Sequence, residues 1–292
     1  MIPEQHTRPL ISYAYNILGS YQDAKDVVQD VMVEVLSHNS SHIENEKAYL
    51  VRSVINRAIN LKNKQKNTVS EYPGNWLPEP VATEGADHAL HRKDILSYSL
   101  MVLMEKLDAR SRAVFILKEA FDYSHEEIAS VLDLSPENSR KILSRAKKIL
   151  GTENVHITAS GFSSDYLNQY IDIIRQGDTK RLEALLNEDI VATSDGGGKA
   201  AAAQHPIIGR DSVLRFISGI FQKFYIDAPV KLGTINHQPA IFYFEEDKLV
   251  TCQIMDIDDE LIKNIYFIRN PDKLSALESE LSRDMHALQS AQ

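Results

Sequence analysis

The sequence has little cysteine and no long apolar run, and each shortage excludes a class of protein. A single cysteine, Cys252, leaves no internal disulfide framework and no cysteine-based zinc finger, and it is interpreted as a small buried residue in a strand. No stretch approaches the roughly 18 apolar residues of a membrane span, and the first residues, MIPEQHTRP, lack the features of a signal peptide. The chain is therefore expected to be soluble and cytoplasmic, without a membrane partner.

The sequence also has fewer basic than acidic residues. The chain of 292 residues has 32 Lys and Arg against 41 Asp and Glu, a formal net charge of −9. This excludes a protein that coats nucleic acid by bulk attraction, but it permits local basic faces. With 43% hydrophobic and 25% charged residues the composition is that of a folded chain, and its length predicts about two domains or more at roughly 150 residues each.

Residues 1–66 have the periodicity of helices. Apolar residues recur at helical spacing from Leu10 to Leu18 and from Ala24 to Leu36, and a polar loop at 37–46 precedes a third helix that starts near Lys47. The third helix alternates cations with asparagines. Amides next to a polar loop suit the capture of unpaired bases, although an ordinary solvated helix fits this pattern equally well.

Residues 67–93 contain prolines, glycines and the only tryptophan, Trp76, and they are interpreted as a linker. A plain flexible linker has no use for an exposed indole between prolines. We therefore expect this segment to dock on another part of the protein.

Residues 94–150 predict a helix-turn-helix. A helix from Arg110 to Ala120 is followed by Ser124 and Glu127, spaced as a capping box, and by a second apolar stripe. Asp133 and Leu134 then turn the chain, and Ser135 with Pro136 marks the start of a third helix. One face of that helix is basic and polar, as a DNA-recognition helix requires, although basic faces also occur on ordinary solvated helices.

From about residue 151 the pattern changes to mixed helix and strand, which indicates an α+β domain. Its last strands are rich in β-branched and aromatic residues. The expected helices are 162–175, 179–186 and 209–225, and the expected strands are 190–194, 230–235, 240–244, 249–256 and 261–268.

Several stretches resemble one family. Residues 8–35 and 47–64 resemble region 2 of the extracytoplasmic-function (ECF) sigma factors of bacterial RNA polymerase, and residues 107–150 resemble their region 4. The motifs WLPEP at 76–80, DGGGK at 195–199 and NPDKL at 270–274 resemble the subgroup with a fused SnoaL-like domain of the NTF2-like cone fold. The resemblance covers the chain from about residue 4 to 274.

The resemblance implies a multi-domain fold with two all-α sigma domains, a σ2 helical bundle and a σ4 helix-turn-helix, and an α+β SnoaL/NTF2-like cone. The expected boundaries are sigma region 2 at 1–66, the linker at 67–93, region 4 at 94–150, the SnoaL-like domain at 160–272 and a helical tail at 273–292. It also implies a sigma factor that binds core polymerase and directs recognition of the −10 and −35 promoter elements, regulated by its fused domain in place of a separate anti-sigma factor.

The resemblance also implies particular binding residues. An acidic helix face would bind the β′ clamp helices of core polymerase, with a further contact to the β flap; its members are Asp23, Asp26, Gln29, Asp30 and Glu34. The melted −10 strand would be read by Asn39, His42, Arg52, Asn56, Arg57 and Asn60. The −35 duplex would be read by Asn138, Arg140, Lys141, Ser144, Arg145 and Lys148.

The three motifs are expected to form a regulatory contact between domains. It would comprise Trp76, Leu77, Pro78, Glu79, Pro80, Asp195, Gly196, Gly197, Gly198, Lys199, Asn270, Pro271, Asp272, Lys273 and Leu274. The glycines permit positive φ and close backbone approach, so the loop is either an ordinary tight turn or a contact loop that touches the sigma domains. Asn270 is expected to cap a last helix that starts at Pro271.

Two other functions compete with the sigma factor. A helix-turn-helix repressor or activator with a ligand sensor would not need the separate first helical domain or the WLPEP linker. A SnoaL-type enzyme would need a base and an oxyanion partner, and Asp195, His205, His237 and Asp256 are candidates by residue type alone. We therefore expect no enzymatic activity, no metal and no cofactor, and leave open an unidentified small ligand in the cone.

Overall fold

In the computed structural model, residues 4–37, 45–83, 94–151 and 164–278 are described. The chain forms two compact units, and the division does not follow the order of the sequence. The first unit combines the helices up to Ser70 with those of residues 94–151, and the second combines residues 71–83 with residues 164–278. Among the helices in these described ranges, none is both long and apolar enough to cross a membrane.

The first three helices are α1 (Glu4–Leu18), α2 (Tyr21–Ser37) and α3 (Glu46–Ser70). Gly19 ends α1 with a φ of 77° and donates its N–H to the Tyr15 carbonyl, as a left-handed C-terminal glycine does. Ser20 caps α2 by accepting a bond from the Asp23 N–H at 3.2 Å. The third helix ends four residues beyond the expected residue 66, because the first helix breakers after it are Pro73 and Gly74.

The second group of helices contains the helix-turn-helix. Its elements are α5 (Tyr98–Leu103), the 3₁₀ turn η2 (Met104–Lys106), α6 (Ala109–Phe115), the π-turn η3 (Ile116–Ala120), α7 (His125–Leu132) and α8 (Pro136–Leu150). The capping box of Ser124 with Glu127 is confirmed, and so is the Ser135 cap of α8 with Pro136 in its first turn. Asp133 makes the turn in the left-handed conformation, with a φ of 55°. The expected single helix 110–120 is interrupted by the π-turn at Ile116–Ala120.

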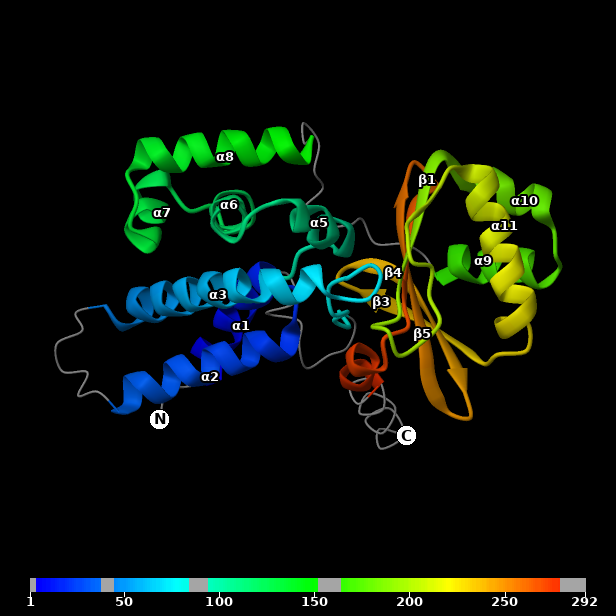
Figure 1. Ribbon diagram of the computed structural model, residues 1–292, viewed down its shortest axis with the longest axis horizontal. Helices are drawn as coiled ribbons and strands as arrows, with labels where there is room; N and C mark the ends of the chain where they lie inside the picture. Colours follow the sequence, from blue (N-terminus) through cyan, green and yellow to red (C-terminus); the bar gives the residue numbers. More distant parts are fainter. Residues whose placement is uncertain (1–3, 38–44, 84–93, 152–163, 279–292) are drawn as a thin grey trace. The chain divides into compact units, whose positions relative to one another are not determined.

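The two groups of helices pack against each other within the first unit. Helix α3 contacts α6 and α7, and α1 contacts α6. Figure 1 shows α3 lying between the pair α1 and α2 on one side and the layer α6, α7 and α8 on the other.

The second unit is a curved sheet with helices on one face (Figure 1). The strand order is β2-β1-β6-β5-β4-β3, in which only β1 and β6 are parallel. The helical elements are α9 (Ser164–Arg175), α10 (Thr179–Leu185), α11 (Arg210–Ile220) and the π-turn η4 (Phe221–Tyr225). The strands are β1 (Leu186–Asp195), β2 (Ile207–Ile208), β3 (Val230–Ile235), β4 (Gln238–Glu245), β5 (Lys248–Asp258) and β6 (Leu261–Ile268).

Apolar residues of the helices and of one sheet face form the core of this unit. Ile241, Tyr243, Met255, Ile265 and Phe267 alternate along β4, β5 and β6 and meet the helices α9, α10 and α11. Burial of this area is the main stabilising contribution, at about 25 cal/mol per Å² of apolar surface. Cys252, on β5, is buried as expected, and burial raises the pKa of its thiol.

Candidate functional site

The three motifs meet around one buried carboxylate. Asp195 ends β1 with no exposed surface, and its side chain accepts four hydrogen bonds. The donors are the Tyr72 hydroxyl at 2.7 Å, the Leu77 N–H at 3.0 Å, the Gly197 N–H at 3.0 Å and the Lys273 ammonium at 2.7 Å. A buried charge is tolerated only when it is paired and hydrogen-bonded, and this one is both. We call these residues, together with Asn270, the Asp195 cluster.

Lys273 joins the linker to the tail. Its ammonium bonds both Asp195 and the Leu77 carbonyl, and it lies 4.4 Å from the centroid of the Trp76 ring and 5.3 Å from that of Tyr72. Its side chain is only 12% exposed, so cation–π attraction adds to the ion pair in a partly desolvated site. Burial and the hydrogen bond to Asp195 raise the pKa of Tyr72 well above its usual range, so its hydroxyl remains a donor at neutral pH.

Asn270 connects the same hydroxyl to the last helix. Its amide N–H donates to the Tyr72 hydroxyl at 2.8 Å, and its carbonyl oxygen accepts from the Asp272 N–H at 3.0 Å. The second bond caps the helix over residues 271–278 and confirms the expected start at Pro271. Outside the buried cluster, Lys199 and Asp272 form an exposed ion pair at 2.5 Å.

Close packing explains the glycines of the 195–199 loop. A Cβ on Gly197 would lie 2.4 Å from the Asn270 amide nitrogen, and one on Gly198 would lie 2.6 Å from Pro73 Cγ. Both glycines have positive φ, 60° and 69°. The loop is thus a tight turn, and within the second unit it contacts the linker and the tail; a contact with the sigma domains stays a prediction.

The linker segment 71–83 docks along the C-terminal domain, as expected from Trp76. The Asn75 amide donates to the Ser194 and Ala203 carbonyls at 3.3 and 3.1 Å. Val81 and Asn236 exchange hydrogen bonds, and Ala82 bridges to Ile235 at the edge strand β3. The segment therefore adds a short piece of chain to the sheet edge, which covers otherwise unpaired backbone groups.

The helix α8 presents one polar face. Asn138, Arg140, Lys141, Ser144, Arg145 and Lys148 are all exposed on it. The opposite face, with Leu143, Ala146 and Leu150, is buried. Arg140 pairs with Glu126 at 3.0 Å, an exposed contact that contributes little to stability.

The residues expected to read the −10 strand differ in their surroundings. Arg52 and Asn60 are exposed on α3. The Asn56 amide donates to the Val131 carbonyl of α7 at 3.0 Å, and Arg57 pairs with Glu34 at 3.1 Å and with Asp30 at 3.9 Å. Asn39 and His42 lie outside the described residues.

The expected polymerase-binding residues lie along α2. Asp26, Gln29, Asp30 and Glu34 are exposed, whereas Asp23 is half-buried and accepts a bond from the Gln65 amide at 2.8 Å. Sequence reasoning missed Val33 and Leu36, which are 59% and 65% exposed on the same helix. The sequence does contain a signal for these two residues, because large apolar residues beside acidic ones on an exposed helix face favour contact with another protein.

The candidate bases of the C-terminal domain do not converge. The Asp256 carboxylate accepts bonds from the amides of Gln238 and Asn264 at 2.9 and 2.8 Å, on the strands next to β5. His237 lies in the turn between β3 and β4, and His205 is exposed. Within the described part of the chain, His, Cys, Asp and Glu side chains form no group that could hold a metal ion.

Buried tyrosines in the core of the C-terminal domain find hydrogen-bond partners in Gln253 and Thr251. The Tyr243 hydroxyl donates to the Gln253 amide oxygen at 2.8 Å, and the Gln253 amide N–H donates to the Tyr170 hydroxyl at 2.9 Å. The Tyr225 hydroxyl lies 2.7 Å from that of Thr251, and its ring centroid lies 4.4 Å from that of Tyr243. Burial raises the pKa of Tyr170 and Tyr243 well above the usual range.

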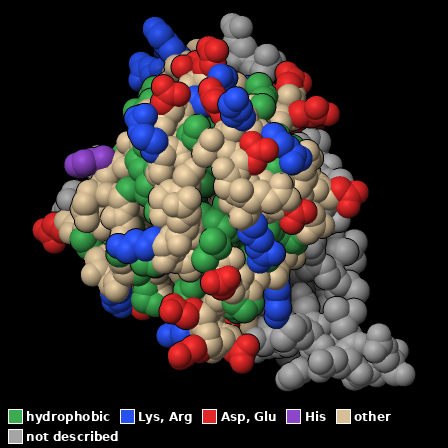
Figure 2. All heavy atoms as spheres, turned by 90° about the vertical axis from the view of Figure 1, so that its right-hand side faces the viewer, with side chains coloured by type: hydrophobic (Ala, Val, Ile, Leu, Met, Phe, Trp, Pro, Cys, Tyr) green, Lys and Arg blue, Asp and Glu red, His purple; other side chains and the backbone are tan. Residues whose placement is uncertain are grey.

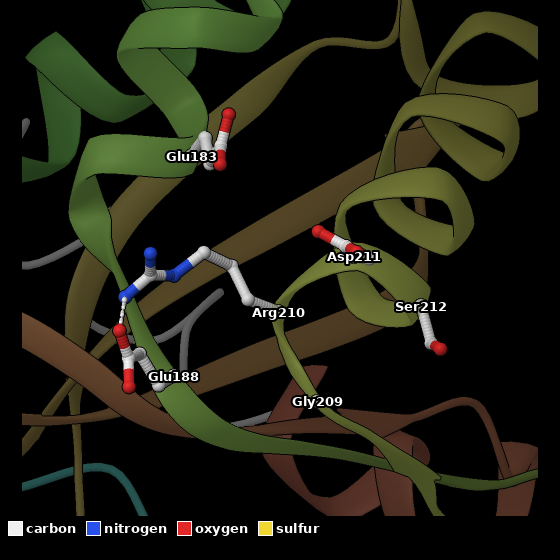
Figure 3. Close-up of a pocket in the computed structure, with 6 residues that line it drawn as sticks. All are labelled: Glu183, Glu188, Gly209, Arg210, Asp211 and Ser212. Carbon is white, nitrogen blue, oxygen red and sulfur yellow. Dashed lines mark ion pairs between the residues drawn. The ribbon is translucent and has the colours of Figure 1, made fainter.

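A separate hollow of about 400 Å³ opens at the start of α11 (Figure 3). Its charged residues are the acids Glu183, Glu188 and Asp211 and the base Arg210. Arg210 bonds the Leu186 carbonyl at 2.9 Å and pairs with Glu188 at 3.8 Å, so it ties α11 to β1. Figure 2 shows acidic and basic side chains intermingled over the side of this unit on which the helices lie, unlike a nucleic-acid surface.

Comparisons with known proteins fit this arrangement. The family description "Sigma-70 region 2" matches residues 3–68, and "Sigma-70, region 4" matches residues 97–150. The "ECF RNA polymerase sigma factor SigJ" of Mycobacterium tuberculosis is 29% identical over 222 residues, 74% of this chain and 70% of its own length. The crystal structure of M. tuberculosis SigJ has a TM-score of 0.74 at 26% identity and covers 93% of this chain and 96% of its own.

A second relative, the "Probable ECF RNA polymerase sigma factor SigI" of M. tuberculosis, is 22% identical over 284 residues, 94% of each chain. The helical unit is thus that of a sigma-70-type transcription initiation factor, with regions 2 and 4. Over most of its length the chain is similar to extracytoplasmic-function sigma factors of RNA polymerase, and the match to the SigJ structure extends over its C-terminal helix-and-sheet domain.

Proposed function

We propose that the C-terminal domain regulates promoter recognition by holding the linker between regions 2 and 4. The Asp195 cluster carries this proposal. Residues 71–83 follow region 2 directly, and Tyr72 and Leu77 bind the C-terminal domain and its tail before region 4 begins. The fused domain thus acts on the connection between the two DNA-reading regions, in place of a separate anti-sigma factor.

The length of the linker sets how far apart regions 2 and 4 can move. The roughly 27 residues between α3 and α5 span at most about 90 Å when fully extended. When residues 71–83 are bound to the C-terminal domain, the roughly 14 residues that follow span at most about 46 Å. Release of the Asp195 cluster therefore lengthens the free connection between regions 2 and 4.

The exposed face of α2 is the proposed contact for the β′ clamp helices of core polymerase. Its acids, Asp26, Asp30 and Glu34, suit a basic partner, and Val33 and Leu36 add apolar area that binding would bury. The family resemblance supports a further contact between region 4 and the β flap. Such a protein acts in the cytoplasm, where core polymerase transcribes.

Promoter DNA is the proposed partner of α3 and α8. The polar face of α8 would read the −35 duplex, and α3 with the loop before it would hold the melted −10 strand. The proposal assigns no catalysis and no ligand to the cone, because its interior tyrosines and Gln253 satisfy one another. The regulatory proposal rests instead on the surface of the C-terminal domain that contacts the linker.

In vitro transcription with core polymerase tests the regulatory role. Lys273→Met removes the ammonium that joins Asp195 to the Leu77 carbonyl, and we expect it to change transcription from the cognate promoter by about threefold or more, as for a lost contact of about 0.7 kcal/mol or more. Lys263→Met is the matched control, since it removes an exposed lysine of the same domain that pairs with Asp258. Equal transcription by the wild type and Lys273→Met would show that the cluster does not regulate.

A second measurement tests DNA reading. Arg140→Ala is expected to weaken promoter binding by about 1–3 kcal/mol if Arg140 reads a base. If Arg140 contacts only a phosphate, binding weakens alike on all sequences and the salt slope falls by about one. Unchanged promoter binding for both Arg140→Ala and Lys141→Ala would contradict the assignment of α8.

A further inference from the structure

Two consecutive residues at the start of α7 contact two consecutive residues of the recognition helix α8. The His125 Nδ1 lies 2.9 Å from the Ser139 hydroxyl, and the Glu126 Oε1 lies 3.0 Å from the Arg140 Nη2. The two helices also pack against each other (Figure 1). The start of α7 therefore sets the positions of Ser139 and Arg140.

The first of these contacts anchors α8. Ser139 has no exposed surface, whereas the side chain of Arg140, the next residue, is 52% exposed. Because the buried hydroxyl of Ser139 meets His125, α8 is held in one rotation about its own axis, and Arg140 leaves the interface on a defined side. Arg140 lies within the first two turns of α8, the part of a recognition helix that reaches base edges.

The start of α7 is a well-ordered base for Glu126. The Ser124 hydroxyl accepts a bond from the Glu127 N–H at 3.1 Å, and the Glu127 carboxylate accepts one from the Ser124 N–H at 2.7 Å, which completes a capping box. Glu126 lies in the same first turn, where the partial positive charge of a helix N-terminus favours a carboxylate. The position of Glu126 is thus set by the fold of region 4 itself.

Arg140 is distinguished from the other cations assigned to the −35 duplex. Among the described residues, no acid forms an ion pair with Lys141, Arg145 or Lys148. The pair of Arg140 with Glu126 is exposed, so it contributes little to stability. An acid next to a DNA-binding face also weakens the attraction to phosphates. Since the pair adds neither stability nor general affinity, its contribution is the orientation of Arg140.

The chemistry of the guanidinium explains what this orientation provides. The guanidinium is a planar fork of N–H donors, and its bidentate contact with guanine uses the O6 and N7 acceptors in the major groove. The bond to Glu126 takes one donor at Nη2 and leaves the rest of the fork for a base. A carboxylate on one side fixes the plane of the fork, whereas an unpaired Arg turns freely between bases and phosphates.

We infer that Glu126 determines specificity in the reading of the −35 element, because it orients Arg140 toward a guanine and away from the phosphates. Glu126 acts through Arg140 and is therefore a positioning residue. The residues predicted from the sequence to read the −35 element all lie on α8, whereas Glu126 lies on α7. The inference rests on the proposed role of α8 and adds the residue that decides how strongly one base pair is selected.

Selection of promoter DNA by the holoenzyme tests the role of Glu126. Core polymerase with the full-length chain selects from promoter fragments randomised over the −35 element, and sequencing of the bound fraction gives the base preference at each position. For the wild type we expect a guanine preference at one position that Arg140→Ala removes. Glu126→Ala is expected to reduce the same preference by about fivefold or more and to leave the other positions unchanged.

A matched control removes the other acid that pairs with α8. Glu119 pairs at 2.9 Å with Lys147, which lies outside the six residues assigned to the −35 duplex, and Glu119→Ala is expected to leave every preference unchanged. A double-mutant cycle separates positioning from direct contact. With Arg140→Ala already present, Glu126→Ala is expected to have no further effect on base preference.

The outcomes distinguish this inference from the assignment of α8 on which it rests. Wild-type preferences in Glu126→Ala, together with the loss of one preference in Arg140→Ala, would overturn the inference alone. A further loss in the double variant would overturn it by showing that Glu126 contacts DNA itself. Weakened preferences at all positions in Glu126→Ala would also overturn it, because they would indicate a merely structural role. Unchanged preferences in Arg140→Ala would overturn both the inference and the assignment of α8.

Discussion

The Asp195 cluster and the Arg112 cluster (Asn16, Lys62, Glu105 and Arg112) are both buried charge networks that join segments distant in the sequence. Only the Asp195 cluster contains residues of the three sequence motifs WLPEP, DGGGK and NPDKL. In the Asp195 cluster the backbone itself approaches closely, so Gly197 and Gly198 cannot carry a side chain. In the Arg112 cluster long side chains reach ordinary helix carbonyls, Asn16 and Leu18, and any backbone supplies those. Close backbone approach leaves a pattern in the sequence, and a contact between a side chain and a backbone carbonyl leaves none.

The largest expected effect is the loss of the cation that pairs with the buried Asp195. Lys273→Met leaves the fully buried Asp195 without its cation, so we expect the free energy of unfolding of the C-terminal domain to fall by about 3–5 kcal/mol. Chemical denaturation measures it. The matched Lys263→Met, from an exposed pair, is expected to cost less than about 1 kcal/mol. Similar losses for both variants would mean that the burial of Asp195 does not matter.

Glycine substitutions test the close approach directly. Gly197→Ala is expected to cost about 2–3 kcal/mol, because its φ is positive and the new Cβ would overlap the Asn270 side chain. Gly219→Ala, in α11 with no atom near the new Cβ, is expected to stabilise by about 0.5–1 kcal/mol. Thermal melting of the two variants gives the comparison, and a melting temperature of Gly197→Ala at or above that of the wild type would refute it.

The Arg112 cluster is expected to respond to acid. Burial raises the pKa of Glu105, but the charges of Arg112 and Lys62 outweigh it and hold the pKa below the ordinary 4.5. A carboxylate with a lowered folded-state pKa stabilises the fold above the unfolded pKa, and that stability is lost as pH falls through the folded pKa. We expect Glu105→Gln to cost about 1–3 kcal/mol at pH 7 and to reduce the loss of stability below pH 4.5. Identical pH profiles for variant and wild type would contradict this.

The smallest expected effect lies at the edge of the Asp195 cluster. Tyr72→Phe keeps the ring that faces Lys273 but removes one of four donors to Asp195, and we expect a loss of about 1 kcal/mol. Denaturation in urea checks the value. A loss as large as that of Lys273→Met would indicate that the hydroxyl, and not the ion pair, holds the cluster together.

The sequence predicted most elements where local signals are strong. The strands 230–235 and 261–268 match β3 and β6 in full, and the caps at Ser124, Ser135 and Asn270 are present. It did not predict β2, which has two residues, or the parallel pairing of β1 with β6. Such pairing depends on tertiary contacts between distant segments, which periodicity does not report.

The candidate sites were predicted unevenly for the same reason. The residues of the three motifs meet in the second unit, and the basic residues of α8 share one exposed face. The engagement of Asn56 by α7 and of Arg57 by the acids of α2 was not foreseen, because both contacts join helices whose packing the sequence leaves open. The roles of these residues in binding polymerase and DNA stay predictions.

The separation of the two sides of the Asp195 cluster has a consequence for the newly made chain. Tyr72 and its partner Asn270 are 198 residues apart. At about 5–20 residues per second, the linker leaves the ribosome roughly 10–40 s before the segment that binds it. Region 2 is complete when that interval begins and region 4 is completed within it, whereas the contact around Asp195 does not yet exist. Each new molecule therefore passes through a period in which its linker is unrestrained, and the rate of translation sets the length of that period.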